Sequence, residues 1–304
     1  MAYFVFTLLS FIWGTTWIAI KITLEGIPPF LGATVRFVIA IVFLLLFGWF
    51  SGVSLSIPRR DYGVLLTSAF FMYVFDYGFV YWGEQYLSAG VTAIFFATFP
   101  IFIGMFSSFV VKSEQLGRAQ IAGTLLGFLG VFIIFHDQLV RTQFNTQIIL
   151  ATIAIVLGAA GGALSTVLVK KHLHHVPTIP LTIHQMLWGA VFLGMLGILQ
   201  GEISQVYLTK RVFYAVLYLG AIGSALAFAS YYWLLKKISA LTISFIIYIT
   251  PVIALLIDRF LFGTSITWQI VLGSATIFSG ITLSQWDAYR QWLYRYRQQK
   301  LSSL

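Results

Sequence analysis

The stretch "YWGEQYLSAGVTAIFFATFP" (81–100) returns in outline later in the chain, as "YWLLKKISALTISFIIYITP" (232–251). At a constant offset of 151 residues, the two copies share Tyr-Trp at the start, Ser-Ala in the middle and Pro at the end. The matched pairs are Tyr81 and Tyr232, Trp82 and Trp233, Ser88 and Ser239, Ala89 and Ala240, and Pro100 and Pro251. Self-similarity at a fixed offset indicates an internally duplicated chain.

Glycines downstream of these segments extend the duplication. After a slip of one residue, two glycines of the first copy meet two of the second: Gly123 with Gly273, and Gly130 with Gly280. Small residues let membrane helices approach closely where no hydrophobic force drives their association.

The front of each half matches as well. "PPFLGATVRF" (28–37) resembles "PTIPLTIHQM" (177–186), and we expect His184 to occupy the place of Arg36. We therefore predict two five-helix repeats, residues 1–143 and 144–286, followed by a basic, aromatic tail at 287–304.

Composition assigns the chain to the membrane. It is 60% hydrophobic and only 9% charged, whereas soluble domains carry about a quarter charged residues. Apolar runs of about 20 residues, long enough to cross the bilayer as helices, recur along its whole length. The first run lacks a basic n-region, so we predict a retained helix. We predict an all-α polytopic protein with ten transmembrane helices, at 3–20, 30–50, 62–82, 87–111, 116–135, 147–169, 179–200, 211–235, 240–258 and 267–286.

Five crossings per half require the two halves to be inverted relative to each other. With a cytoplasmic N-terminus, the cytoplasmic segments hold twelve basic residues: Arg59, Arg60, Lys112, Arg118, Lys170, Lys171, Lys236, Lys237, Arg290, Arg295, Arg297 and Lys300. The opposite side holds five: Lys21, Arg141, Lys210, Arg211 and Arg259. This bias obeys the positive-inside rule and predicts that both termini are cytoplasmic. Inverted repeats are typical of secondary transporters, whose substrate site lies near the midplane between the repeats.

Here the chain resembles a known family. "LSFIWGTTWIAIK" (9–21), "PPFLGATVRFVIAIVFLLL" (28–46), the paired "YLSAG…P" and "KISAL…P" segments and "SEQLGRAQIAGTLLGFLGV" (113–131) look like the EamA domains of the drug/metabolite transporter superfamily. The resemblance implies a ten-helix transporter with a central cavity that exports small metabolites or amino acids. His184 in place of a second arginine departs from the pattern and would make the two half-sites chemically unequal.

Two opposite charges lie inside the predicted helices. Asp76 is six residues from Trp82, about 9 Å below the outer surface, and Arg36 lies about 10 Å below the same surface. Either they form a fixed structural ion pair, or one or both line the translocation path, where Asp76 could bind a substrate amine or a proton. Asp76 is the more specific candidate, because Ala227 is its counterpart and Arg36 is generic to the family that the chain resembles.

Histidines offer further candidates. His184 could couple transport to protons, or could instead be hydrogen-bonded to a neighbouring helix. His172 and His175 are spaced to grip a metal, but they lie in a basic loop with no carboxylate nearby, so we predict no metal site and no cofactor.

Aromatic residues at mid-depth suggest a pocket for an organic solute. With the ionisable groups, the predicted substrate-binding or translocation residues are Trp13, Thr16, Arg36, Tyr73, Asp76, Phe96, His184, Trp188 and Tyr248. Most of the aromatic members could instead serve helix packing. Pro100 and Pro251 each leave a carbonyl without its donor and permit a kink, so we predict that they act in gating.

These observations favour transport over other functions. The chain has no cysteine and no metalloprotease, nucleophile-elbow or phosphate-loop motif, so we predict no enzymatic activity. We predict a multi-pass inner- or plasma-membrane secondary transporter that exports amino acids or similar amphipathic solutes by alternating access, with protons as a candidate coupling ion and no nucleic-acid partner. A monomer would suffice, and a dimer is compatible with the sequence. The alternatives are a channel-like uncoupled facilitator and a lipid or drug translocator of the same fold.

Overall fold

The structure is a computed structural model that describes residues 1–110, 116–262, 267–286 and 289, and only the backbone of 258–262. The first half contains α1 (Ala2–Leu24), α2 (Pro29–Ser51), α3 (Tyr62–Ala69), α4 (Tyr77–Glu84), α5 (Ala89–Phe96), α6 (Phe99–Val110) and α7 (Arg118–Arg141). The second half contains α8 (Thr146–His172), α9 (Thr178–Leu199), α10 (Lys210–Gly220), α11 (Ala227–Leu235), α12 (Ala240–Ser244), α13 (Ile246–Phe262) and α14 (Trp268–Ser284). Apart from Tyr289, the predicted tail 287–304 lies outside the described residues, as does Lys112; the side chain of Arg259 is also not described.

Within the described ranges, nine helical segments are long and apolar enough to cross a membrane, judged by length and composition. A further apolar helix, Trp268–Ser284, has 17 residues. Large apolar side chains such as Phe43, Phe47 and Leu129 are exposed on these helices. A bilayer would cover such a surface, so the protein is a multi-pass membrane protein.

The largest difference from the predicted helix ends is in α7. The sequence predicts a loop beginning at His136, but the helix continues to Arg141. The side chains of His136 and Asp137 are 50% and 57% exposed. Polar residues therefore mark where this helix leaves its apolar surroundings, not where the helix ends.

Two helical segments in each half are interrupted. π-helical turns join α3 to α4 at Phe70–Asp76 (η2) and α10 to α11 at Ala221–Leu226 (η4). The turns begin 151 residues apart, the offset of the repeat. The next segment is also broken in both halves, at residues 97–98 between α5 and α6 and at Phe245 between α12 and α13. π-helical turns are rare and occur frequently at functional sites.

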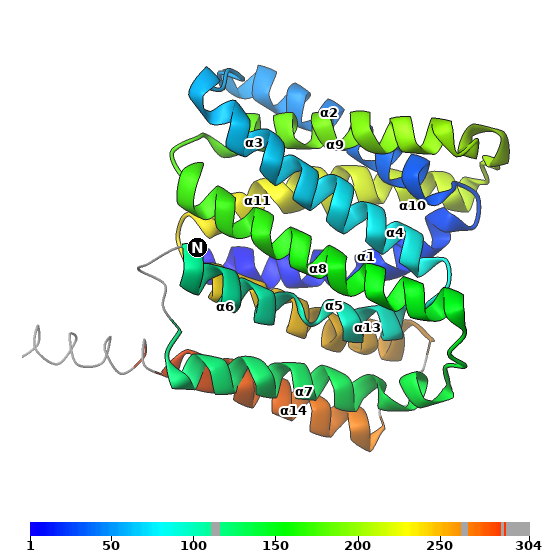
Figure 1. Cartoon of the computed structure of the whole chain (residues 1–304), viewed down its shortest axis with the longest axis vertical. Coiled ribbons are helices and arrows are strands. Elements are labelled where there is room, and N and C mark those ends of the chain that lie inside the picture. Colours follow the sequence, from blue (N-terminus) through cyan, green and yellow to red (C-terminus); the bar gives the residue numbers. More distant parts are fainter. Residues whose placement is uncertain (111–115, 263–266, 287–288, 290–304) are drawn as a thin grey trace, which may run out of the picture.

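The first helix of each half packs mainly against helices of the other half. In the first half, α1 packs against α10, α11 and α13 of the second half; its counterpart α8 packs against α3, η2, α4 and α6 of the first. Two other pairs of counterparts meet directly, α2 with α9 at one end of the long axis and α7 with α14 at the other (Figure 1). Neither half therefore encloses a core of its own.

Helices α7 and α14 pack antiparallel, with glycines at their points of contact. A Cβ at Gly123 would lie 2.4 Å from the Gly280 carbonyl oxygen, and one at Gly130 would lie 2.6 Å from the Gly273 oxygen. Residue numbers increase along α7 from Gly123 to Gly130 while those of their partners on α14 decrease from Gly280 to Gly273, which shows that the two helices are antiparallel. Because these four glycines carry no side chain, the backbones can touch along the seam.

The α2–α9 pair is antiparallel too. Gly48 lies near Ile179 at one end of the pair, and Gly197 lies near Leu31 at the other. There the Glu202 carboxylate accepts a hydrogen bond from the Leu31 amide at 2.8 Å. Counterpart helices of the two halves thus meet antiparallel at both ends of the bundle.

Candidate functional site

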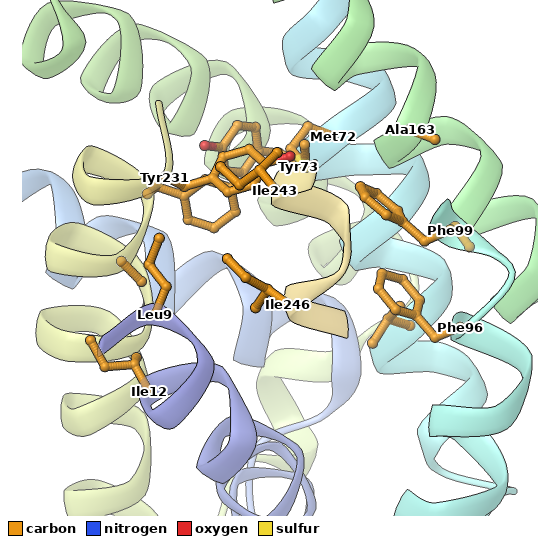
Figure 2. Close-up of a cluster of buried hydrophobic side chains, with 14 of the residues drawn as sticks. Leu9, Ile12, Met72, Tyr73, Phe96, Phe99, Ala163, Tyr231, Ile243 and Ile246 are labelled. Atoms are coloured by element: carbon orange, nitrogen blue, oxygen red, sulfur yellow. The ribbon is translucent and has the colours of Figure 1, made fainter. Parts of the chain in front are cut away.

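A partly open cavity lies between the two halves, with about 710 Å³ of atom-free space that includes space open to solvent. Seventeen residues line it: Trp13, Thr16, Trp17, Ile20, Arg36, Met72, Asp76, Tyr77, Val80, Phe96, Phe99, Phe228, Tyr231, Ile243, Ser244, Ile247 and Thr250. The lining is mostly aromatic and aliphatic, with Arg36 and Asp76 as its two charged members. Figure 2 shows buried side chains of this region, with Phe96 and Phe99 beside the α5–α6 break and Ile243 and Ile246 beside the α12–α13 break.

Asp76 is the last residue of η2 and is 4% exposed. Its carboxylate lies against two glycines of α8: a Cβ at Gly162 would be 2.2 Å from Oδ2, and one at Gly158 would be 3.5 Å from Oδ1. Among the described residues, no hydrogen bond or ion pair engages this carboxylate. The glycines of α8 therefore make the space in which an unpaired acid meets the cavity.

Arg36, on α2, is engaged by the opposite half. Its Nε donates to Ser224 Oγ at 2.5 Å and its Nη2 donates to the Gly223 carbonyl oxygen at 3.0 Å. Both acceptors belong to the π-helical turn η4. The guanidinium also lies over the Tyr77 ring, 4.8 Å from its centroid.

A fixed Arg36–Asp76 ion pair, one of the two alternatives that the sequence leaves open, is absent from the described part of the chain. The two side chains nevertheless line the same cavity, as their predicted common depth implies. Arg36 is held by η4 and not by Asp76, so the acid and the base are separate features of one wall.

The structure places five of the predicted site residues in the cavity lining: Trp13, Thr16, Arg36, Asp76 and Phe96. Tyr73 lies behind the lining, fully buried, with its ring 4.9 Å from Phe37 and 5.3 Å from Phe228. Trp188 is half-buried on α9, with its ring 6.3 Å from that of Phe192, and is not among the lining residues.

Tyr248 is a packing residue. Its ring occupies the space beside Gly127, where a Cβ would lie 2.3 Å from the ring, and its hydroxyl donates to the Thr124 carbonyl oxygen at 2.9 Å. Tyr248 therefore fastens α13 to α7 and points away from the cavity lining.

His184 neither lines the cavity nor is the counterpart of Arg36. Both helices begin directly after a proline, Pro28 before α2 and Pro177 before α9. This sets the offset at 149 residues and pairs Arg36 with Gln185, so the expected match with His184 is wrong by one residue. His184 instead hydrogen-bonds to the Leu55 carbonyl oxygen at 3.0 Å.

Gln185 is fully buried, and its Nε2 donates to Ser68 Oγ at 2.6 Å, just before η2. Arg36 reaches across to η4 in the same way. The two half-sites are therefore chemically unequal, as predicted. The difference is that the first half has the guanidinium of Arg36 where the second has the neutral amide of Gln185.

The histidine loop differs from expectation in one contact. His175 Nε2 lies 2.9 Å from Asp61 Oδ2, so the prediction that no carboxylate lies nearby is wrong. Within the described ranges, no group of three or more histidine, cysteine or acidic side chains could hold a metal ion.

The prolines lie close to the two helix breaks. Pro100 is the second residue of α6, directly after the first break, and Pro251 lies six residues beyond the break at Phe245. Because Pro251 has no N–H, the Ile247 carbonyl loses its helical donor, and the Thr250 hydroxyl donates to it at 3.1 Å.

Several lining residues were not predicted from the sequence. Trp17, Tyr77, Phe228 and Tyr231 all face the cavity, and no residue pattern distinguishes them from ordinary packing aromatics. The π-helical turns that present Asp76 and hold Arg36 were missed as well. The only sequence feature that relates the two turns is their spacing, since they begin 151 residues apart, the offset of the repeat.

Sequence comparison matches residues 1–136 and 149–286 to the EamA-like transporter family, so the matches cover most of the chain. The chain is 24% identical over 282 residues to the uncharacterized transporter YoaV of Bacillus subtilis (strain 168), covering 93% of this chain and 96% of YoaV. It is 27% identical over 280 residues to Protein PagO of Salmonella typhimurium, covering 92% and 91% of the two chains. A solved crystal structure at 21% identity superposes with a TM-score of 0.82 over 95% of this chain and 98% of its own, which shows the fold alone. The chain belongs to the EamA-like transporter family.

Proposed function

We propose that the protein is a secondary transporter that exports amino acids or similar amphipathic amines by alternating access. The observation that carries this proposal is the cavity between the halves, with one acid and one base in an aromatic wall. Asp76, with no protein donor among the described residues, suits a solute ammonium. Arg36 uses two of its five N–H donors on η4, which leaves others for a solute carboxylate.

The proposed topology has ten membrane spans in two inverted repeats, 1–143 and 144–286, with both termini cytoplasmic and the chain in the inner or plasma membrane. The antiparallel pairing of α2 with α9 and of α7 with α14 supports inversion. The distribution of basic residues supports the orientation. A single chain supplies both halves, so a monomer would suffice.

In the proposed mechanism the halves rock about the cavity, and the two broken helices gate it. This is supported by the lining, since Phe96 and Phe99 flank one break and Ile243 and Ile247 flank the other. The interrupted helix, with a proline directly after the first break and another six residues beyond the second, lowers the resistance to bending. Protons are the proposed coupling ion.

The test is flux in proteoliposomes. Radiolabelled leucine, phenylalanine, putrescine and adenosine are offered with and without a pH gradient. We expect saturable flux and counterflow for an amino acid or amine. Steady single-channel current in a planar bilayer, or flux that does not saturate, would contradict alternating access.

Gly162→Ala is expected to weaken transport without unfolding the protein. The new Cβ would lie 2.2 Å from Asp76 Oδ2, so the carboxylate must move, and misplacing a binding group by about 1 Å costs about 10–100-fold in kcat/KM. Gly158→Ala is the matched control, because its Cβ would lie 3.2 Å from the Asp76 backbone oxygen and 3.5 Å from Oδ1, so that its neighbours need to shift by only a few tenths of an ångström. Equal flux in the two variants would contradict a role for this carboxylate.

A further inference from the structure

A second buried acid lies beyond the cavity on the helix that carries Asp76. Glu84 is the last residue of α4 and has no exposed surface. Neither of its carboxylate oxygens has a hydrogen-bond partner among the described residues. Asp76, Val80 and Glu84 follow one another at intervals of four residues, so they share a face of the helix, and Val80 belongs to the cavity wall.

A lysine stands beside this acid. Lys21 follows the lining residue Ile20 on α1, and its ammonium donates to the backbone carbonyl of Glu84. No ion pair joins it to the Glu84 carboxylate in the described part of the chain. Lys21 and Glu84 thus form the next layer past the cavity rim made by Ile20 and Val80.

The second half supplies an internal comparison. With Pro28 aligned to Pro177, Lys21 corresponds to Lys170, whose ammonium donates to the Leu235 carbonyl oxygen at 2.9 Å. Leu235 is the counterpart of Glu84 at the offset of 151. The lysine-to-carbonyl contact is therefore made in both halves, with an acid at this position in the first half and a leucine in the second.

The surroundings of Glu84 favour its neutral form in this conformation, because a buried carboxylate without donors is unstable unless it takes up a proton or a cation. On the neighbouring helix α8, the Ile155 side chain and the Ala151 backbone carbonyl oxygen lie beside Gly83, the residue before Glu84, and neither supplies a donor to the carboxylate. The charged or titratable groups that act on Glu84 are Lys21 from α1, Arg36 from α2 and Tyr81 on its own helix. Among these, Lys21 can supply a compensating charge by turning from the carbonyl to the carboxylate.

We propose that Glu84 is a proton-binding site of this transporter. It takes up one proton as a neutral carboxyl in this conformation, and it releases that proton to the membrane face where α1 and α4 end when Lys21 pairs with the carboxylate. Coupling to solute movement rests on the proposed function, whereas proton binding does not. The second half, with Leu235, has no such site at the equivalent position.

The direct test is infrared titration of the lipid-reconstituted protein, with protons as the only ligand. The wild type should show a protonated carboxyl band that persists in Asp76→Asn and is lost in Glu84→Gln. An unchanged band in Glu84→Gln would overturn the proposal. Should Glu84→Gln fail to fold, Lys21→Met decides: the band should persist to higher pH than in the wild type, and an unshifted titration would overturn it.

Flux measurements then distinguish loss of the Glu84 proton site from loss of solute transport. In Glu84→Gln, solute exchange should stay within about twofold of wild type, while accumulation driven by a pH gradient should fall about 10-fold or more. Retained accumulation would overturn the coupling role, and loss of both exchange and accumulation in a folded variant would mark Glu84 as structural. If the wild type moves no solute but shows the Glu84 band, the proposed function fails and the proton site stands.

Discussion

Asp76→Asn is expected to lower kcat/KM for a transported amine by roughly 30-fold or more, because truncating one partner of a buried charge contact costs about 2–5 kcal/mol. The amide keeps the size of the side chain beside Gly162 but removes the negative charge that would bind an ammonium. No described protein donor depends on the carboxylate, so folding should be preserved. The measurement is initial flux in proteoliposomes over a range of solute concentrations, together with thermal unfolding.

The matched control is Asp137→Asn, the same chemical change at an acid that is 57% exposed and is not among the lining residues. It should transport like the parent. Asp76→Glu should retain more activity than Asp76→Asn, because it keeps the charge. Parental flux in Asp76→Asn at every pH would show that the acid does not act in translocation.

Arg36→Met is expected to destabilise the fold by roughly 2–3 kcal/mol, the scale of hydrogen bonds that involve a charged group. The change removes the donors that reach the Gly223 carbonyl and the Ser224 hydroxyl, and both acceptors belong to a buried π-helical turn. It also leaves Asp76 as the one charged residue of the cavity lining. Denaturant unfolding of the purified protein, followed by tryptophan fluorescence, measures the change.

Two variants show whether this effect belongs to the guanidinium. Ser224→Ala removes one acceptor and should cost about 1 kcal/mol. Gln185→Met removes the neutral counterpart in the other half, with its single bond to Ser68, and should also cost about 1 kcal/mol. If Arg36→Met costs no more than these two, Arg36 is not a principal contact between the halves.

Much of the fold follows from the sequence. Apolar length locates the helical segments, and the copied Tyr-Trp, Ser-Ala and Pro positions reveal the duplication. Helix ends do not follow as directly, as α7 shows: a polar run beginning at His136 does not distinguish a loop from a helix that emerges into water. The one-residue error in predicting the counterpart of Arg36 also arises from an ambiguous local pattern. Both repeat segments contain two prolines, at 28–29 and at 177 and 180, and only the helix starts decide which of them correspond.

The site was harder to predict than the fold. Depth along a helix can be counted, and it placed Arg36 and Asp76 together correctly in one wall. The direction of a side chain around the helix depends on its neighbours, which is why Tyr248 packs against Gly127 and Tyr231 reaches the cavity. π-helical turns rotate all later residues, so η2 changes what the face of α4 presents without any residue that signals it.

The paired lysines near the ends of α1 and α8, the first helix of each half, bear on how the chain enters the membrane. In the proposed topology Lys21 and Lys170 lie on opposite faces, each bound to the carbonyls that close α4 or α11. The scaffold thus demands one positive charge on each side, and these two charges give the insertion machinery no preference. The orientation of the nascent chain must then depend on the basic residues outside this pair, such as Arg59 and Arg60. Moving those residues across the membrane would challenge the orientation while leaving both helix ends intact.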